Sequence, residues 1–344
     1  MSSLLVGLLS ALVATNATAT LDSVITQATG LSVKMPNPND PVEMELKKLM
    51  AEDDDAQAEV DGWLRDNDRF RAKGAGISDT EMNRRIRKRF DPVRQGYEDL
   101  IKRYPTNANA RVAFASFLKD LGDSEGEVSQ LEKARELDPK DPAIWNNLAN
   151  YYGEFGPATN AFAYYEKAVE LDPTEPVYYE NFADAVCMLR KDAREYYHLT
   201  EQEVFDRSLV LYSKATKLAP DDFPLAANLA ETFYIIRPLR LEAALEAWTN
   251  ALHTAHNDVE REGVHIHLAR LKAGAGRFDE ARAHLNAVTN PAYAKLKEAG
   301  AHNIALREQA AAETNGSPAA VTTPVSPAAV KQTNDPAISP AEKP

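Results

Sequence analysis

Four prolines set a regular spacing in the middle of the chain. Pro105, Pro139 and Pro173 stand 34 residues apart, and Pro220 follows after 34 plus 13 residues. A fixed period of this length is typical of repeats that stack so that each unit buries its apolar face against the next. The spacing therefore predicts a solenoid of helical repeats.

The segment between the second and third of these prolines carries the most complete pattern. Spacings of three and four residues place one group of side chains on a stripe of a first helix and a second group on the facing stripe of a second helix. The positions are Trp145, Leu148, Ala149 and Tyr152, then Gly156, then Ala161, Tyr165, Ala168, Leu171 and Pro173. At these residues the segment resembles the tetratricopeptide repeat. The resemblance implies an all-α, right-handed α-solenoid of stacked helix-turn-helix repeats with helical caps, in which Trp145 fills a pocket between helices.

About five repeats fit the frame over residues 105–290, with an insertion near residues 190–203. In the third repeat we expect the first helix to run on towards Tyr196. Thr200 and Glu203 have the spacing of a capping box, which predicts that the second helix begins at Glu201. Two extra residues around Arg237 and Pro238 break the helix pair of the fourth repeat.

Residues 41–104 are predicted to form an N-terminal helical cap. Asp40 and Pro41 indicate a helix start, and the helix is expected to end at Trp63 or Leu64. A glycine break at residues 74–76 precedes a second helix capped by Ser78, and Pro92 is expected to start a third. Residues 291–311 are predicted to be a C-terminal capping helix, because the end repeat of a solenoid needs a polar outer surface.

The two ends of the sequence have other signals. An apolar run from Leu4 to Val13, followed by Ala17-Thr18-Ala19, predicts a signal peptide over residues 1–19 and export to the periplasm or the extracellular space. The alternative is an uncleaved anchor or a protein that is not secreted, because no Lys or Arg precedes the apolar run. Residues 20–40 are predicted to be a linker, and the Ala-, Pro- and Thr-rich residues 312–344 a disordered tail.

Charge and cysteine content restrict the classes of function. With 52 acidic and 39 basic residues, the net charge of −13 argues against nucleic acid as a partner. The basic run from Arg84 to Arg89 is interpreted as a solvated helix face, with contact to an anionic partner as the alternative. Cys187 is the single cysteine, so the chain forms no internal disulfide.

A row of asparagines is the strongest functional signal. Asn147, Asn181 and Asn228 occupy the sixth position of the first helix in three successive repeats, where Ala113 and His267 interrupt the row in the outer repeats. The resemblance implies that this position faces the concave side and that such a row binds the main chain of an extended peptide, since a carboxamide both donates and accepts hydrogen bonds. The alternative is that asparagine is simply common at this position.

Further positions expected to line the concave groove make it acidic with apolar patches. These are Asn146, Asn150, Glu154, Glu180, Asp184, Glu231 and Tyr234, together with Cys187, Met188, Ile235 and Arg270. Such a surface favours a protein or peptide partner with basic and aliphatic residues, through charge complementarity. An ordinary solvated face is the alternative interpretation.

Histidines supply the rival class of function, a metal-binding or enzyme-associated accessory protein. His253, His256, His265 and His267 cluster in the sequence, with His284 on the facing helix. Residues two apart on a helix point to nearly opposite sides, so His265 and His267 cannot both face one ion. The sequence contains none of the common nucleophile, phosphate-loop or metalloprotease motifs. We therefore predict an interaction scaffold that is not an enzyme and needs no cofactor or metal.

Overall fold

The computed structural model describes residues 40–316, and all regular elements in this range are helices. The predicted signal peptide, most of the predicted linker and the tail beyond residue 316 lie outside the described residues. The chain divides after Val264 into two compact units. No helix within residues 40–316 has the length and apolar character needed to cross a membrane.

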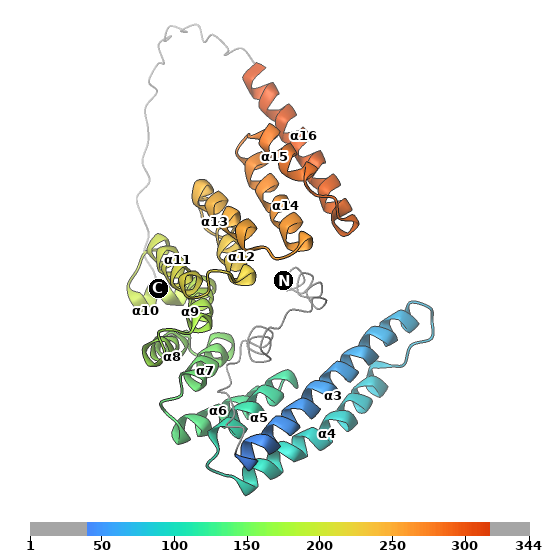
Figure 1. The fold of residues 1–344 in the computed structure, drawn as a ribbon, viewed down its shortest axis with the longest axis vertical. Coiled ribbons are helices and arrows are strands. Elements are labelled where there is room, and N and C mark those ends of the chain that lie inside the picture. Colours follow the sequence, from blue (N-terminus) through green and yellow to red (C-terminus); the bar gives the residue numbers. More distant parts are fainter. Residues whose placement is uncertain (1–39, 317–344) are drawn as a thin grey trace, which may run out of the picture. The chain divides into compact units, whose positions relative to one another are not determined.

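The first unit begins with a long helical hairpin, in which α3 (Pro41–Arg71) and α4 (Asp79–Arg103) run antiparallel (Figure 1). The predicted starts are confirmed: Asp40 accepts a hydrogen bond from the Val42 N–H, and Ser78 accepts one from the Glu81 N–H. The predicted end of the first helix at Trp63 or Leu64 is wrong. The helix continues because Asn67 is buried and its carboxamide bonds both the N–H and the carbonyl of Ile77, which fixes the returning chain.

The prediction that Pro92 starts a third helix is also wrong, because Pro92 lies inside α4. A proline in a helix interior removes one hydrogen bond and costs about 3 kcal/mol. Here Pro92 is exposed, so the carbonyl that loses its donor can reach water. Phe90, Val93 and Tyr97, on the opposite side, pack into one core with α3 and α5, which keeps the helix continuous.

A buried polar contact lies within this core. Tyr97 donates a hydrogen bond to Asp53 across 3.2 Å, and Gln57 donates another across 3.3 Å. Burial raises the pKa of Asp53 to about 6, although these two hydrogen bonds favour its charged form. The Tyr97 hydroxyl thus offsets part of the cost of burying a carboxylate.

Four helix pairs follow in the first unit, as the period predicts (Figure 1). They are α5 (Ala108–Asp120) with α6 (Ser124–Leu137), α7 (Pro142–Phe155) with α8 (Ala158–Leu171), α9 (Pro176–Met188) with α11 (Glu201–Leu218), and α12 (Phe223–Thr232) with α13 (Leu241–Thr254). Ala149, Ala161 and Ala168 are completely buried, which allows close approach of helices, and Tyr165 stacks on Phe182 of the next repeat. The stacked pairs form an α-solenoid of tetratricopeptide type.

The insertion in the third repeat differs from the prediction. Helix α9 ends at Met188, and a separate short helix, α10 (Arg190–Tyr197), follows the non-helical Leu189. The expected continuous helix to Tyr196 is therefore wrong. The physical reason is packing: the turn brings Tyr196 and Tyr197 onto Phe162 of α8, with ring centroids 5.4 and 5.5 Å apart.

The helix start after this insertion agrees with the sequence pattern. Thr200 and Glu203 form both hydrogen bonds of a capping box, and α11 begins at Glu201. Further along, the break expected near Arg237 and Pro238 separates α12 from α13.

Trp145 does not fill a closed pocket as expected. Its side chain is only partly buried, and its ring N–H donates to the Pro139 carbonyl across 2.9 Å. The edge of Tyr164 contacts it, with ring centroids 5.3 Å apart. By contrast, Trp248 of α13 is 2% exposed and forms part of the interior.

The boundary between the two units falls within α14 (Asp258–Gly274). In the second unit, the end of this helix is followed by α15 (Phe278–Asn286), the short 3-10 helix η1 (Pro291–Tyr293) and α16 (Ala294–Gly316). Ala269, Ala281, Leu285 and Ile304 form its core. Helix α16 continues past the predicted end at residue 311.

Candidate functional site

An open groove lies between the second and third repeats of the first unit. Its volume is about 410 Å³. Its walls come mainly from the first helices of these repeats, α7 and α9, and the lining residues are Asn150, Gly153, Glu154, Tyr165, Asn181, Asp184, Ala185, Met188 and Leu189. Five of these residues, Asn150, Glu154, Asn181, Asp184 and Met188, were expected on the groove surface from the sequence.

Tyrosine hydroxyls orient two of the polar groups in this groove. Tyr165 donates to the Asn150 side-chain oxygen across 2.6 Å. The hydroxyl of Tyr212 donates to Asp184. Both tyrosine rings are buried in the core of the repeats. Their hydroxyls therefore hold the Asn150 carboxamide and the Asp184 carboxylate from the core side of the groove. The groove therefore presents polar groups whose positions are fixed in advance.

Two carboxyl groups one turn apart on α9 have altered acidity. Asp184 is reached by water but has protein on most sides, and the loss of solvation raises its pKa, against the effect of the Tyr212 hydrogen bond. Burial raises the pKa of Glu180 to about 7, and repulsion from Asp184 adds to the shift, while the hydrogen bond from Asn228 opposes it. A cationic group bound beside them would favour the charged forms of both carboxyl groups.

The three asparagines of the predicted row occupy different environments. Asn147 is completely buried, and neither its side-chain nitrogen nor its oxygen has a hydrogen-bond partner within residues 40–316. Asn181 lines the groove and donates to the buried Asn146 across 3.1 Å, whereas the exposed Asn228 donates to Glu180 across 2.8 Å. The expected projection of all three into the groove is met at Asn181 but not at Asn147, because Asn147 lies in the packed interior.

The last two predicted site residues lie in the fourth repeat, outside this groove. Burial raises the pKa of Glu231, at the end of α12. Tyr234 is partly buried, with its ring centroid 6.2 Å from that of Trp248.

Four lining residues were missed by the sequence analysis: Gly153, Tyr165, Ala185 and Leu189. Of these, Tyr165 has a recognisable signal. The repeat pattern has phenylalanine at this position, and the added hydroxyl needs a polar partner when the ring is buried. That partner is Asn150 in the groove.

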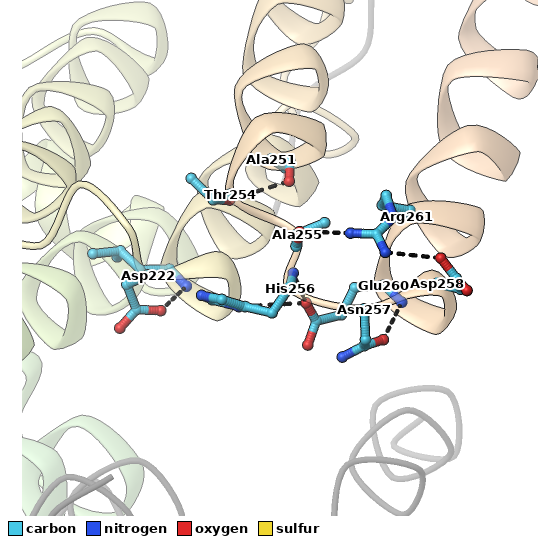
Figure 2. A network of polar contacts seen from close by, with 10 residues as sticks. Asp222, Ala251, Thr254, Ala255, His256, Asn257, Asp258, Glu260 and Arg261 are labelled. Carbon is cyan, nitrogen blue, oxygen red and sulfur yellow. Dashed lines mark hydrogen bonds and ion pairs between the residues drawn. The ribbon is translucent and has the colours of Figure 1, made fainter. Parts of the chain in front are cut away.

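The histidines do not form a metal-binding cluster. Within the described part of the chain, no group of three or more His, Cys, Asp or Glu side chains is arranged to hold an ion. Figure 2 shows His256 at the start of α14, where its backbone N–H donates to Glu260 across 2.6 Å while Asn257 accepts from the Glu260 N–H. His256 and its neighbours thus cap a helix.

Two histidines of the second unit, His267 and His284, have lowered pKa values. The Nδ1 atoms of His265 and His284 lie 2.9 Å apart, and burial lowers the pKa of His284 to about 4. Burial also lowers the pKa of His267 to about 4. At neutral pH these shifts favour uncharged rings at His284 and His267, and in the His265–His284 contact the tautomers decide which Nδ1 atom donates.

Comparison with known proteins agrees with the helix pairs. Residues 142–175 match the model of the tetratricopeptide repeat family. This segment contains α7 and α8, whose spacing and packing are described above. This segment of the chain is therefore a tetratricopeptide repeat.

Several solved structures are similar to it at low sequence identity. PilW, a type IV pilus biogenesis factor, is 16% identical with a TM-score of 0.47, and the match covers 63% of this chain and 93% of PilW. PilF of Pseudomonas aeruginosa is 14% identical with a TM-score of 0.45, covering 76% and 99% of the two chains. YrrB, described as having an unusual peptide-binding site, is 16% identical with a TM-score of 0.42, covering 58% and 95%. A comparison with curated proteins gave no match.

Proposed function

We propose that this protein is an interaction scaffold that binds an extended segment of a partner protein in the groove between α7 and α9. The observation that supports this most is the lining of the groove, where oriented amide and carboxylate groups lie beside apolar side chains. Ligand sites commonly combine a few fixed polar groups with apolar surface. No catalytic residue is part of this proposal.

The lining suggests which chemical groups would bind. The carboxamides of Asn150 and Asn181 can donate to and accept from a peptide main chain. Glu154 and Asp184 would attract a lysine or arginine side chain, and Met188, which is 67% exposed, offers adaptable apolar contact. The favoured partner is therefore an extended peptide with basic and aliphatic residues.

Only part of the predicted asparagine row belongs to the proposed binding site. Asn181 is at the groove, and Asn228 would contribute to a longer segment that reaches the fourth repeat. The buried Asn147 would support the wall of the groove instead of touching the peptide. Glu231 and Tyr234 would contact only such a longer segment.

Export of the protein to the periplasm or the extracellular space is also part of the proposal. If residues 1–19 act as a signal peptide, the partner is a periplasmic or extracellular protein. N-terminal sequencing of the protein from its native source checks this: a mature chain that begins near Thr20 supports export, whereas an intact Met1 contradicts cleavage.

Selection from a displayed library of random linear peptides tests the groove directly. The chain should enrich sequences with Lys or Arg beside aliphatic residues, and fluorescence anisotropy then gives the affinity of one enriched peptide. The variant Asp184→Asn with Glu154→Gln keeps the side-chain shapes and removes both charges. It should weaken binding at least about tenfold, because hydrogen bonds to charged groups contribute about 1.5–3 kcal/mol each.

A matched control changes two exposed carboxylates outside the groove, Glu195→Gln with Asp221→Asn. It alters the net charge equally and should leave the affinity within about twofold, since distant surface charges are screened by salt. Equal losses in both variants would show that only the overall charge matters. Enrichment of no peptides, or full binding by the groove variant, would contradict the proposed site.

A further inference from the structure

The end of the N-terminal hairpin is strongly basic in an acidic protein. From Trp63 to Arg89 the sequence contains nine Lys and Arg residues and four Asp and Glu residues, whereas from Asp40 to Asp61 it contains two basic and nine acidic residues. The whole chain has a net charge of −13. One half of the hairpin therefore differs in sign from the other half and from the rest of the protein.

This basic half, residues 63–89, extends beyond the core that joins the hairpin to the repeats. The buried residues of that core end at Val60 on α3 and Phe90 on α4, and the partly buried Trp63 and Ile86 pack against its edge. In residues 63–89 only Asn67 and Met82 are buried. A helix rises about 1.5 Å per residue, so the turn before Ser78 lies about 18 Å beyond Phe90. Figure 1 shows the connection between α3 and α4 at one end of the hairpin and α5 at the other.

Large apolar side chains are exposed at the same end. Phe70 is 53% exposed, Leu64 41% and Ile77 38%. Phe70 lies two helical turns after Trp63 and on the same side of α3, and the guanidinium of Arg85 lies 3.7 Å from the centre of a Trp63 ring. Apolar and cationic groups thus share this flank of the hairpin.

Several of the cations there are available to a partner. Arg69, Arg71, Arg84 and Arg89 form ion pairs within the hairpin. By contrast, no ion pair within residues 40–316 involves Arg65, Lys73, Arg87 or Lys88, all of which are exposed. These four side chains would carry most of the attraction to an anionic surface.

We propose that the end of this hairpin docks on the surface of an anionic phospholipid bilayer. Exposed Phe, Leu and Ile side chains can enter the boundary between headgroups and acyl chains, while Lys and Arg around them contact the anionic headgroups. Residues 68–80 at the hairpin end are all exposed, and a lipid interface accepts such a surface without a preformed cavity. The surface is separate from the groove between α7 and α9, so the inference does not depend on the proposed peptide binding.

Vesicle flotation of the full chain tests the proposal. Vesicles of phosphatidylcholine alone are compared with vesicles that contain about 30% phosphatidylglycerol, at low and physiological salt. The tip variant changes the four unpaired cations to Glu: Arg65→Glu, Lys73→Glu, Arg87→Glu and Lys88→Glu. The control changes four exposed lysines without ion pairs elsewhere in the first unit: Lys47→Glu, Lys133→Glu, Lys191→Glu and Lys217→Glu.

Both variants have the same net charge, and both retain residues 1–39, so any contribution from that segment is common to them. The unmodified chain should float with the anionic vesicles, and the tip variant should partition at least about tenfold less, because each basic residue near such a surface adds to the attraction. At physiological salt the control should remain within about threefold of the unmodified chain, because its lysines lie outside residues 63–89 and salt screens charges away from the contact. The double variant Phe70→Ser with Leu64→Ser should also reduce partitioning. Circular dichroism checks that this variant keeps its helix content.

Three results would overturn the proposal. The first is an absence of vesicle binding by the unmodified chain at low salt. The second is an equal loss in the tip variant and the control, which would assign binding to net charge. The third is binding of the tip to a polyglutamate peptide together with no binding to anionic vesicles, which would indicate an acidic protein as the partner.

Discussion

Glu127 allows a direct test of how burial affects this fold. It lies on α6 at the position that Ala161 occupies on α8, one repeat later, and only 3% of its surface is exposed. Burial raises the pKa of Glu127 to about 7; Lys119 opposes the shift, and Glu154 and Asp120 increase it. The variant Glu127→Gln keeps the shape and removes the charge.

The expected change in unfolding free energy follows from the pKa shift of Glu127. A carboxyl group with a higher pKa in the folded state than in the unfolded state stabilises the fold fully below the unfolded pKa, and this stability is lost as the pH rises through the folded pKa. A change from the ordinary 4.5 to about 7 corresponds to about 3 kcal/mol at most, and partial screening by water lowers it to about 2 kcal/mol. Relative to Glu127→Gln, the unmodified protein should therefore lose about 2 kcal/mol of unfolding free energy between pH 4.5 and pH 8.

Urea unfolding followed by circular dichroism at several pH values measures this difference. Glu125→Gln, which changes an exposed carboxylate of the same helix, is the matched control. The difference between Glu127→Gln and the unmodified protein should increase with pH through the range 5–8. A difference that stays constant over this range would refute the link between the burial of Glu127 and its titration.

Other expected outcomes concern stability. Trp248→Ala should lower the unfolding free energy by about 3–5 kcal/mol, because Trp248 is fully packed, and Trp145→Ala should cost at least about 1 kcal/mol less, since Trp145 is partly exposed; urea unfolding compares the two. Thr200→Ala should cost about 1 kcal/mol through loss of the capping box, measured in the same way, and Thr200→Ser should restore most of it. Tyr97→Phe should lower stability at pH 8 by about 1–3 kcal/mol, because Asp53 loses a hydrogen-bond donor in the core, and a smaller effect is expected at pH 4, where Asp53 is protonated.

The repeats could be predicted from the sequence because their signals are local. Proline spacing, small residues at helix contacts and the Thr200–Glu203 pair each depend on neighbours within one or two helices, and the structure confirms them. Much of the groove lining followed from the same frame, since Asn150, Asn181 and Asp184 hold fixed positions on first helices.

The features that were predicted wrongly are set by contacts between segments that are distant in the sequence. The end of α3 is fixed by Asn67 and Ile77, and the break at Leu189 by the packing of Tyr196 and Tyr197 on Phe162. The burial of Asn147 likewise depends on the packing around its helix, which the position in the repeat does not specify. Sequence spacing alone contains none of this information.

Asp184, which lines the groove, and Glu180, one turn earlier on α9, also link peptide binding to proton exchange. Near pH 7, a carboxyl group such as Glu180, with a pKa of about 7, is about half protonated. A cationic side chain that bound beside Glu180 and Asp184 would favour their charged forms and expel protons into the buffer. The measured heat of binding would then vary with the ionisation enthalpy of the buffer, and the affinity would increase as the pH rises from 6 to 8. A partner held by these groups would be released on acidification, while the N-terminal hairpin and the first repeat, in which Asp53 and Glu127 become uncharged, gain stability.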